Sequence, residues 1–318
     1  MSAASDNWIS RTIFTTFAIA AFLGNGLVLG CYLKKRKRPT LTPFDIYVIN
    51  LALSDVLAGV FLIFNRFVYL PAMPNSQPNA HLFCTILWGG YILFGLCYVS
   101  VYTCVALTIE RWLAVVKPHI YRRIKNKNAL ISLIFVWLWA FFINSTVFIS
   151  VDENFEKGKC KWVEPNFGEK IFPFLELSFS CVLPFSIIIF LYSHIVWKIR
   201  RMENFLKQSK HNYKRRITII GLAASAALVV GWTPVKVSFM LRYTGVGGKH
   251  LQGPIHLAFI MLASSNSFVN PILYGIYSSK FRDEYKEIIG GFFCQIFTRQ
   301  SSGRREKKST SKNLIELV

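Results

Sequence analysis

The stretch Phe268–Lys286 reads FVNPILYGIYSSKFRDEYK and places Asn270, Pro271 and Tyr274 within an otherwise apolar run. In water, a proline at such a position often ends a helix. In hydrocarbon, the same polar and helix-breaking residues are costly, because buried polar groups lose their hydrogen bonds to water. The composition of the whole chain therefore decides the fold, since it tells which solvent surrounds this stretch.

The chain is too apolar for an ordinary soluble domain, because 53% of its 318 residues are hydrophobic and only 17% are charged. Several runs carry almost no Lys, Arg, Asp or Glu, and they exceed the roughly 20 residues that a helix needs to cross a bilayer. The pattern predicts an all-α membrane protein, a seven-transmembrane helix bundle. The expected spans are residues 9–33, 43–70, 81–115, 129–151, 171–200, 212–243 and 250–278.

Basic residues dominate alternate loops and account for the formal net charge of +21. The motif KKRKR occupies residues 34–38, and other basic segments are 117–128, 198–216 and the tail from Lys280. The positive-inside rule places these segments in the cytosol, with the N-terminus extracellular and the C-terminus cytoplasmic. Nucleic acid is not an expected partner, because its binding would require these charges on one soluble face.

A short amphipathic helix is predicted after the last span, at about residues 280–293. Phe281, Tyr285 and Ile288 share one of its faces, so we expect it to lie against membrane lipid at the inner surface. Cys294 is a candidate for palmitoylation, and the alternative is a free cytosolic thiol. We therefore expect one membrane domain, residues 1–293, and a disordered basic cytosolic tail, residues 294–318.

Polar residues inside the spans are functional candidates, because hydrocarbon penalises them. Asn25, Asp55 and Asn270 all fall in mid-span or in the inner half of a span. Packed together they would form one polar core. For Asp55 we favour a Na⁺ or proton site over a purely structural hydrogen-bonded cluster, since an isolated carboxylate in lipid needs a cation or a proton. No cofactor beyond such an ion is predicted.

The inner end of the third span carries Glu110 and Arg111, where an adjacent acid can hold the guanidinium until a cytosolic partner competes for it. The alternative is an arginine that only reaches interfacial water. Spans 5, 6 and 7 contain Pro184, Pro234 and Pro271, and proline bends a helix by removing a backbone hydrogen bond. A passive kink is the alternative for each of them.

Together these residues resemble the ordered motif set of the rhodopsin-like (class A) G protein-coupled receptors. The resemblance covers all seven spans and the helix after them. It implies a non-enzymatic receptor in the plasma membrane that activates a heterotrimeric G protein and, once phosphorylated on its tail, recruits arrestin. The motifs are GN at 24–25, LALSD at 51–55, ERW at 110–112, Trp137, Pro184 with Tyr192, WTP at 232–234 and NPILY at 270–274.

The resemblance also assigns roles to the opening stretch. Pro271 would be a hinge, and Tyr274 would swing inward on activation to meet Tyr192 near Arg111. The sequence departs from the family at Lys214, which stands where an acid usually pairs with that arginine, so we expect signalling without ligand. Trp112 replaces the usual tyrosine and offers no phenol to the second cytosolic loop.

Candidate ligand contacts come from the outer halves of the spans. Lys236 lies one turn outside Trp232 on the same face, and Glu176 either faces the ligand or forms a salt bridge with Lys236 in the empty receptor. Leu93 replaces the Asp of amine receptors, which argues against a biogenic amine, and the seventh span lacks the Lys that retinal requires, which excludes an opsin. The candidates are Arg66, Trp88, Tyr91, Glu176, Trp232, Lys236, Phe239, Arg242 and His256.

Cys84 and Cys160 are the only cysteines at the predicted outer edge, so we expect them to form a disulfide. Polar and apolar stretches around Gly158 predict a hairpin lid there. A hairpin lid and a mixed-charge pocket resemble peptide receptors, including neuropeptide receptors, so a peptide ligand is expected and a small non-amine molecule is the alternative. Two other classes of membrane protein are alternatives. A transporter or channel would show inverted repeats, and an intramembrane enzyme would need a metal cluster or a nucleophile pair; the sequence shows neither pattern.

Overall fold

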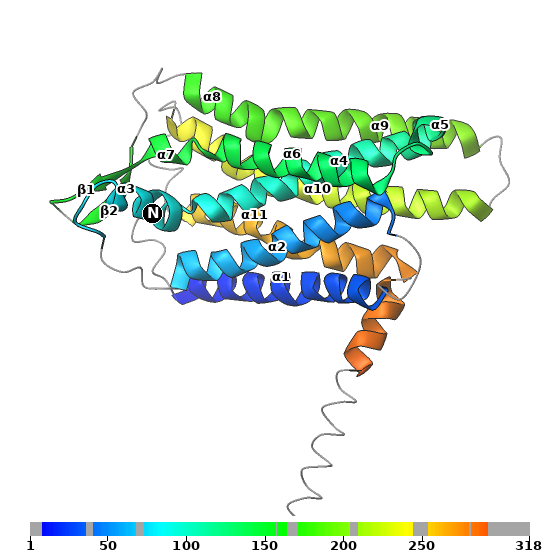
Figure 1. Cartoon of the computed structure of the whole chain (residues 1–318), viewed down its shortest axis with the longest axis horizontal. Helices are drawn as coiled ribbons and strands as arrows, with labels where there is room; N and C mark the ends of the chain where they lie inside the picture. Colours follow the sequence, from blue (N-terminus) through cyan, green and yellow to red (C-terminus); the bar gives the residue numbers. More distant parts are fainter. Residues whose placement is uncertain are drawn as a thin grey trace, which may run out of the picture.

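The computed structural model describes residues 8–35, 41–67, 73–156, 158–163, 171–203, 209–243, 254–279 and 281–291. Within these residues, seven helices are long and apolar enough to cross a membrane, which confirms the predicted spans and a multi-pass membrane protein. The long helices lie side by side with a two-stranded hairpin at one end of the bundle and a short helix leaving the other end (Figure 1).

The spans are built mainly from α1 (Trp8–Lys35), α2 (Pro43–Phe67), α4 (Tyr91–Val116), α6 (Asn126–Asn144), α9 (Leu183–Glu203), α10 (Ser209–Tyr243) and α11 (Pro254–Tyr277). Shorter helices are α3 (Asn79–Phe83), α5 (Pro118–Tyr121), α7 (Val147–Ser150), α8 (Ile171–Leu177) and a final helix at 281–291, with the π-helices η2 (Cys84–Trp88) and η3 (Ser178–Val182). Strands β1 (Val151–Asn154) and β2 (Lys159–Trp162) pair antiparallel, so that Glu153 lies opposite Cys160.

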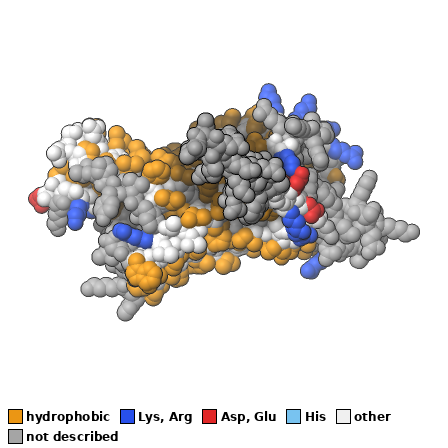
Figure 2. Space-filling model, turned by 90° about the horizontal axis from the view of Figure 1, so that it is seen from below, with side chains coloured by type: hydrophobic (Ala, Val, Ile, Leu, Met, Phe, Trp, Pro, Cys, Tyr) orange, Lys and Arg blue, Asp and Glu red, His pale blue; other side chains and the backbone are white. Residues whose placement is uncertain are grey.

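We call the end with β1 and β2 the hairpin end, and the end with Lys34, Arg111 and Arg200 the basic end. Between them, hydrophobic side chains cover the middle of the molecule, and charged side chains gather towards both ends (Figure 2). Many large apolar residues point outward; Phe135 and Leu138 are 66% and 65% exposed. In water this surface would be an aggregation hazard, but lipid tails solvate it.

The core of the bundle is apolar and lies where α4, α9 and α10 meet. Tyr192, Ile195, Leu228 and Trp232 are buried there and pack with Val101. Because β-branched and aromatic side chains fill this space closely, the packing sets the rotation of each helix about its axis. That rotation then decides which polar residues meet inside the bundle.

The third predicted span, 81–115, is not one continuous helix. Helix α4 begins only at Tyr91, and α3 and η2 precede it as a separate helical segment. Gly90 has φ 72°, a left-handed conformation that glycine adopts without the steric cost of a Cβ. The glycine pair Gly89–Gly90 therefore separates the segment that carries Cys84 from the helix that carries Arg111.

A close approach between α1 and α11 explains the GN motif. A Cβ placed on Gly24 would lie 3.1 Å from the Cβ and Cγ of Pro271. Only a glycine leaves room for the proline ring without a shift of one helix. Pro271, which lies inside α11, is thus packed directly against the first span.

The final helix packs its apolar face on the bundle. Phe281 is buried, its ring stacks on Tyr274 at 5.3 Å between centroids, and it meets the edge of Tyr32. On the other side of the same helix, Glu287 forms an ion pair with Lys34. The predicted amphipathic helix is confirmed, and part of its apolar face is covered by protein. Cys294 lies outside the described residues.

Candidate functional site

A buried polar core lies midway along the bundle, between α2, α4 and α11. Asp55 is 1% exposed, its Oδ1 accepts a hydrogen bond from Ser100 at 2.7 Å, and its Oδ2 accepts one from Asn270 at 3.1 Å. Ser54 and Ser100 share a further hydrogen bond at 3.0 Å. Sequence reasoning missed Ser100, although a hydroxyl in mid-span is itself a polar residue in hydrocarbon.

Asn25 joins this core through the backbone of α11. Its Nδ2 donates to Ser267 O at 2.6 Å and to Ala21 O at 3.0 Å, and not to Asp55. The buried Oδ1 of Asn25 has no hydrogen-bond partner within the described residues. The structure therefore brings Asp55 and Asn270 into contact and links Asn25 to them indirectly.

The donor set fits a small hard cation. Asp55 supplies a buried carboxylate that forms no ion pair within the described chain; Ser100 brings a hydroxyl oxygen to it, Asn270 brings its amide nitrogen, and Asn25 holds an amide oxygen without a partner among the described residues. Na⁺ and similar ions prefer oxygen ligands of this kind. The described residues hold no cluster of three His, Cys, Asp or Glu side chains, so a transition-metal site is not supported there.

Towards the hairpin end, a second polar cluster joins α4, α8 and α10. Lys236 Nζ lies 2.6 Å from Glu176 Oε1, and the Tyr98 hydroxyl donates to the same oxygen at 2.8 Å. The side chains of Lys236 and Glu176 are only 11% and 9% exposed. The structure thus forms the Lys236–Glu176 salt bridge that the sequence left as one of two alternatives.

Aromatic rings surround the ammonium group of this pair. Lys236 Nζ lies 4.8 Å from the centre of the Tyr98 ring and 5.8 Å from that of Trp232, and the two rings are stacked. Such rings attract a cation through their negative faces. Tyr98 was missed by sequence reasoning, because its role depends on which face of α4 is turned towards α10.

Other predicted ligand residues lie elsewhere. Tyr91 packs on Phe141 and Phe148, and its hydroxyl donates to Phe141 O at 3.3 Å, so it contacts α6 and α7. Trp88 packs in the apolar cluster beside the disulfide, and His256 Nδ1 lies 3.3 Å from Ser238 Oγ on α10. Phe239 is half-buried on α10. The side chains of Arg66 and Arg242 lie outside the described part of the chain.

At the basic end, Glu110 and Arg111 form a two-pronged ion pair. Both guanidinium contacts, Nε to Oε2 and Nη2 to Oε1, are made, and the side chains are 3% and 11% exposed. The Arg111 guanidinium also lies 4.3 Å from the centre of the Phe44 ring. The arginine is therefore held inside the bundle by its neighbour and does not simply reach water.

A phenol from α5, the short helix that follows α4, completes this pair. The Tyr121 hydroxyl donates to Glu110 Oε1 at 2.6 Å. Burial and the bond to the Glu110 carboxylate raise the pKa of Tyr121, so it stays a donor at neutral pH. Trp112 turns away from this site, and its indole Nε1 donates to His194 Nδ1 on α9 at 3.1 Å.

The predicted switch tyrosines occupy separate places. The hydroxyl of Tyr192 approaches the backbone of α10 at Gly221, where a Cβ would clash with it. Tyr274 instead packs on Phe281 of the final helix, with 3% of its surface exposed. Pro234 lies inside α10 and Pro271 inside α11. The side chain of Lys214 lies outside the described residues.

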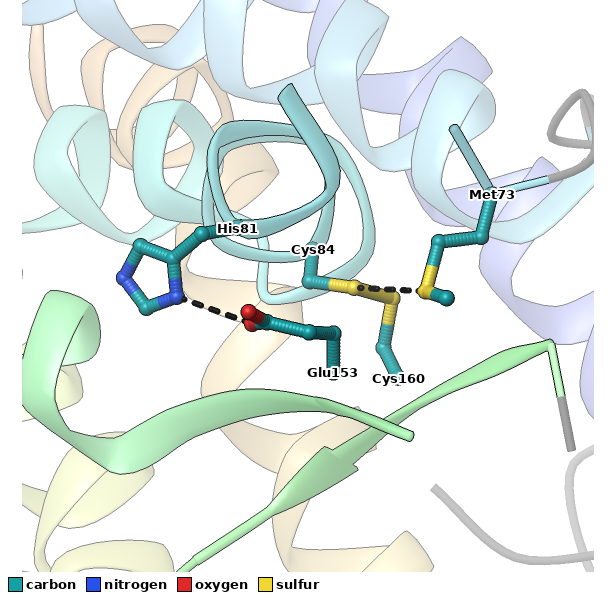
Figure 3. The surroundings of a disulfide bond; sticks show 5 residues. All are labelled: Met73, His81, Cys84, Glu153 and Cys160. Atoms are coloured by element: carbon teal, nitrogen blue, oxygen red, sulfur yellow. Dashed lines mark hydrogen bonds and ion pairs between the residues drawn. A yellow bond between two sulfur atoms is a disulfide. The ribbon is translucent and has the colours of Figure 1, made fainter. Parts of the chain in front are cut away.

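At the hairpin end, Cys84 and Cys160 form the predicted disulfide (Figure 3), which joins η2 to β2. Met73 Sδ lies 3.7 Å from Cys84 Sγ. Beside it, His81 contacts Glu153 Oε2 through Nδ1 at 3.2 Å and Phe148 O through Nε2 at 3.1 Å. The hairpin is thus held by the disulfide and by polar contacts of Glu153 with His81 and Gln77.

Cys160→Ser is expected to loosen the hairpin without unfolding the bundle, because the disulfide joins two segments outside the long helices. Amide hydrogen exchange across residues 151–162 should become more than about tenfold faster. Exchange in α4 should stay unchanged. Equal acceleration in both regions would contradict this attachment, and Cys97→Ser, which touches no disulfide, is the matched control.

Comparison with known proteins assigns the class. The model of the 7 transmembrane receptor (rhodopsin family) matches residues 24–274. The chain therefore belongs to this family of receptors, which signal through G proteins by conformational change, without catalysis.

The relatives of this chain are distant, and their names refer to different ligands. It is 24% identical to the tachykinin-like peptides receptor 86C of Drosophila melanogaster, over 96% of this chain but only 64% of that protein's length. Galanin receptor type 1 of Rattus norvegicus is 25% identical over 96% of this chain and 88% of its own length. Cysteinyl leukotriene receptor 1 of Sus scrofa is 24% identical over 87% of this chain and 83% of its own length.

Proposed function

We propose that this chain is a plasma-membrane receptor for an extracellular peptide, with the hairpin end outside the cell and the basic end in the cytosol. The observation that carries the proposal is the buried Lys236–Glu176–Tyr98 cluster on the hairpin side of Trp232. A ligand with charged groups can exchange partners with this pair, because both charges are already desolvated and held in one place. The similarity to two peptide receptors supports the peptide class.

In this proposal, ligand binding rearranges α10 next to Trp232 and Pro234, and the movement reaches the basic end. There Arg111 leaves Glu110 to contact the G protein, and Tyr274 leaves Phe281 to meet Tyr192. Residues 1–293 act as the receptor unit. Residues 294–318 form a cytosolic tail that recruits arrestin after phosphorylation, and Cys294 carries a palmitoyl chain.

The proposed ligand class is tested by nucleotide exchange in membranes that contain the receptor and a G protein. A set of synthetic neuropeptides is compared with biogenic amines, lipid mediators and retinal. At least one peptide should raise exchange, and Lys236→Met should remove its effect. Activation by a lipid mediator alone would replace the peptide with a small molecule, and activation by retinal would contradict the absence of lysine from α11.

We further propose that Asp55 and Asn270 hold a Na⁺ ion in the resting receptor, with oxygen atoms of Ser100 and Asn25 nearby. The ion would neutralise the Asp55 carboxylate and so stabilise the resting arrangement of α2 and α11. It shifts the equilibrium only by its difference in affinity for the two states. By reciprocity, an agonist must weaken Na⁺ binding by the same factor.

Asp55→Asn is expected to abolish sensitivity to Na⁺ while the fold remains intact, since the amide keeps the volume and removes the charge. For the unmodified receptor, about 150 mM NaCl, compared with choline chloride at the same ionic strength, should raise the unfolding temperature and lower ligand-free exchange. Full Na⁺ sensitivity in Asp55→Asn would make the polar core purely structural. Ser54→Ala, which leaves the carboxylate in place, is the control.

A further inference from the structure

We propose that the groove between α9 and α10 binds an acyl chain of an anionic phospholipid, whose phosphate contacts Arg200. The groove has a volume of about 560 Å³ and lies on the outside of the bundle, towards the basic end. Ile188, Ile189 and Trp197 line it from α9, and Leu222 and Val230 line it from α10. Its volume is in the range of pockets that bind small organic molecules.

The length of the groove matches one leaflet of a bilayer. From Ile188 to Arg200 the helix rises about 18 Å, at roughly 1.5 Å per residue. Half of the hydrocarbon thickness is about 15 Å. On the antiparallel α10, Leu222 is nearer the basic end and Val230 is deeper in the bundle. A chain that starts at Arg200 therefore ends near the middle of the membrane.

The walls of the groove suit a hydrocarbon chain. Ile188 at its floor is 2% exposed, and the flanking Ile189 and Val230 are 57% and 64% exposed. These outer side chains face the lipid, so the groove opens directly to the acyl region. An acyl chain held in the groove makes van der Waals contacts with both walls, which compensates for its loss of conformational freedom.

The positive charge of Arg200, at the end of the groove nearest the basic end, favours an anionic lipid headgroup. Arg200 is exposed and forms no ion pair with any residue that the structure describes. The adjacent Arg201 is already engaged, since its guanidinium lies 5.6 Å from the centre of the Trp197 ring. Trp197 is 54% exposed, which is typical of indoles at the membrane interface. Arg200 is thus placed to contact a lipid phosphate through a charge-assisted hydrogen bond.

Native mass spectrometry of bound lipid tests the proposal. The full chain is reconstituted in vesicles of equal phosphatidylcholine and phosphatidylserine, and then extracted in mild detergent. The receptor should retain phosphatidylserine in preference to phosphatidylcholine. Arg200→Gln should lower this preference about fivefold, the effect of one basic residue at an anionic surface. Arg201→Gln is the matched control and should leave the preference unchanged.

A second pair of variants tests the groove itself. Leu222→Trp and Val230→Trp fill it from an outward-facing position, so both should reduce retention of both lipids. An unchanged preference in Arg200→Gln, or an equal loss in Arg201→Gln, would overturn the proposal. Retention of added cholesterol in place of phospholipid would assign the groove to a sterol and overturn it as well. Because no signalling is measured, the outcome is independent of the proposed function.

Discussion

Replacing Arg111 with alanine is expected to abolish G protein activation and also to destabilise the receptor. The loss of activation follows from the role proposed for this guanidinium at the basic end. The loss of stability follows from Glu110, which is 3% exposed and would keep, among the residues that the structure describes, only the Tyr121 phenol as a partner. Removal of one member of a buried ion pair costs about 3 to 5 kcal/mol.

The double variant Glu110→Gln/Arg111→Ala separates the two effects. It removes the buried charge together with its partner, so its unfolding temperature should return towards that of the unmodified receptor. Nucleotide exchange should remain at background. If the double variant regained exchange, Arg111 would be only a structural partner of Glu110, and the proposed role in coupling would be wrong.

The Glu110–Arg111 ion pair also bears on Lys214, which stands where the family usually has an acid that pairs with this arginine. Glu110→Gln weakens the hold on Arg111 and should raise ligand-free exchange, whereas Lys214→Glu should lower it by offering a second acid. Lys214→Met is the control that removes the charge without adding an acid. If Lys214→Glu left ligand-free exchange unchanged, the argument from the missing acid would fail.

Lys236→Met is expected to destabilise the receptor by about 3 to 5 kcal/mol, because it leaves the Glu176 carboxylate buried without a cation. The exchanged variant Glu176→Lys/Lys236→Glu keeps one charge of each sign at the same place. It should recover most of the stability and lose the response to the ligand. Unfolding and exchange measured on the same preparations give both quantities.

Tyr98→Phe measures how much one hydrogen bond of this cluster contributes to the free energy of unfolding. It removes only the hydroxyl that bridges Lys236 and Glu176, so it should cost about 0.5 to 1.5 kcal/mol, the range of a single hydrogen bond. If the exchanged variant were as unstable as Lys236→Met, the pair would depend on its particular packing more than on its charges. The ligand would then not be expected to exchange partners with it.

The sequence predicted the spans because the solvent dictates them: the surface of a helix that faces hydrocarbon must be apolar over the whole thickness of the bilayer. It also predicted the Cys84–Cys160 disulfide and the hairpin, which depend on compartment and local turn residues. The side-chain contacts inside the bundle were harder to predict from the sequence. Tyr98 and Tyr121 were missed because their contacts depend on the rotation of α4 and on the path of a loop, neither of which has a spacing pattern.

Breaks within spans were missed for a related reason. An apolar run looks the same whether its backbone is an α-helix or a π-helix, as in η2 and η3. The φ of 72° at Gly90 is a property of the folded backbone, and a glycine within a span can equally serve close helix packing, as Gly24 does.

The break at Gly89–Gly90 determines how force can pass through the third span. The disulfide attaches the hairpin to η2, which is on the far side of this glycine joint from Arg111. Because glycine has the widest range of backbone conformations, we expect tension on the hairpin to bend the chain at Gly90 before it turns α4. In the proposed receptor, a ligand would then act on α4 on the other side of the joint, through the Tyr98 contact with Lys236. In mechanical terms, the hairpin would then cover the end of the bundle without turning α4, and the Lys236–Glu176–Tyr98 cluster would transmit rotation to that helix.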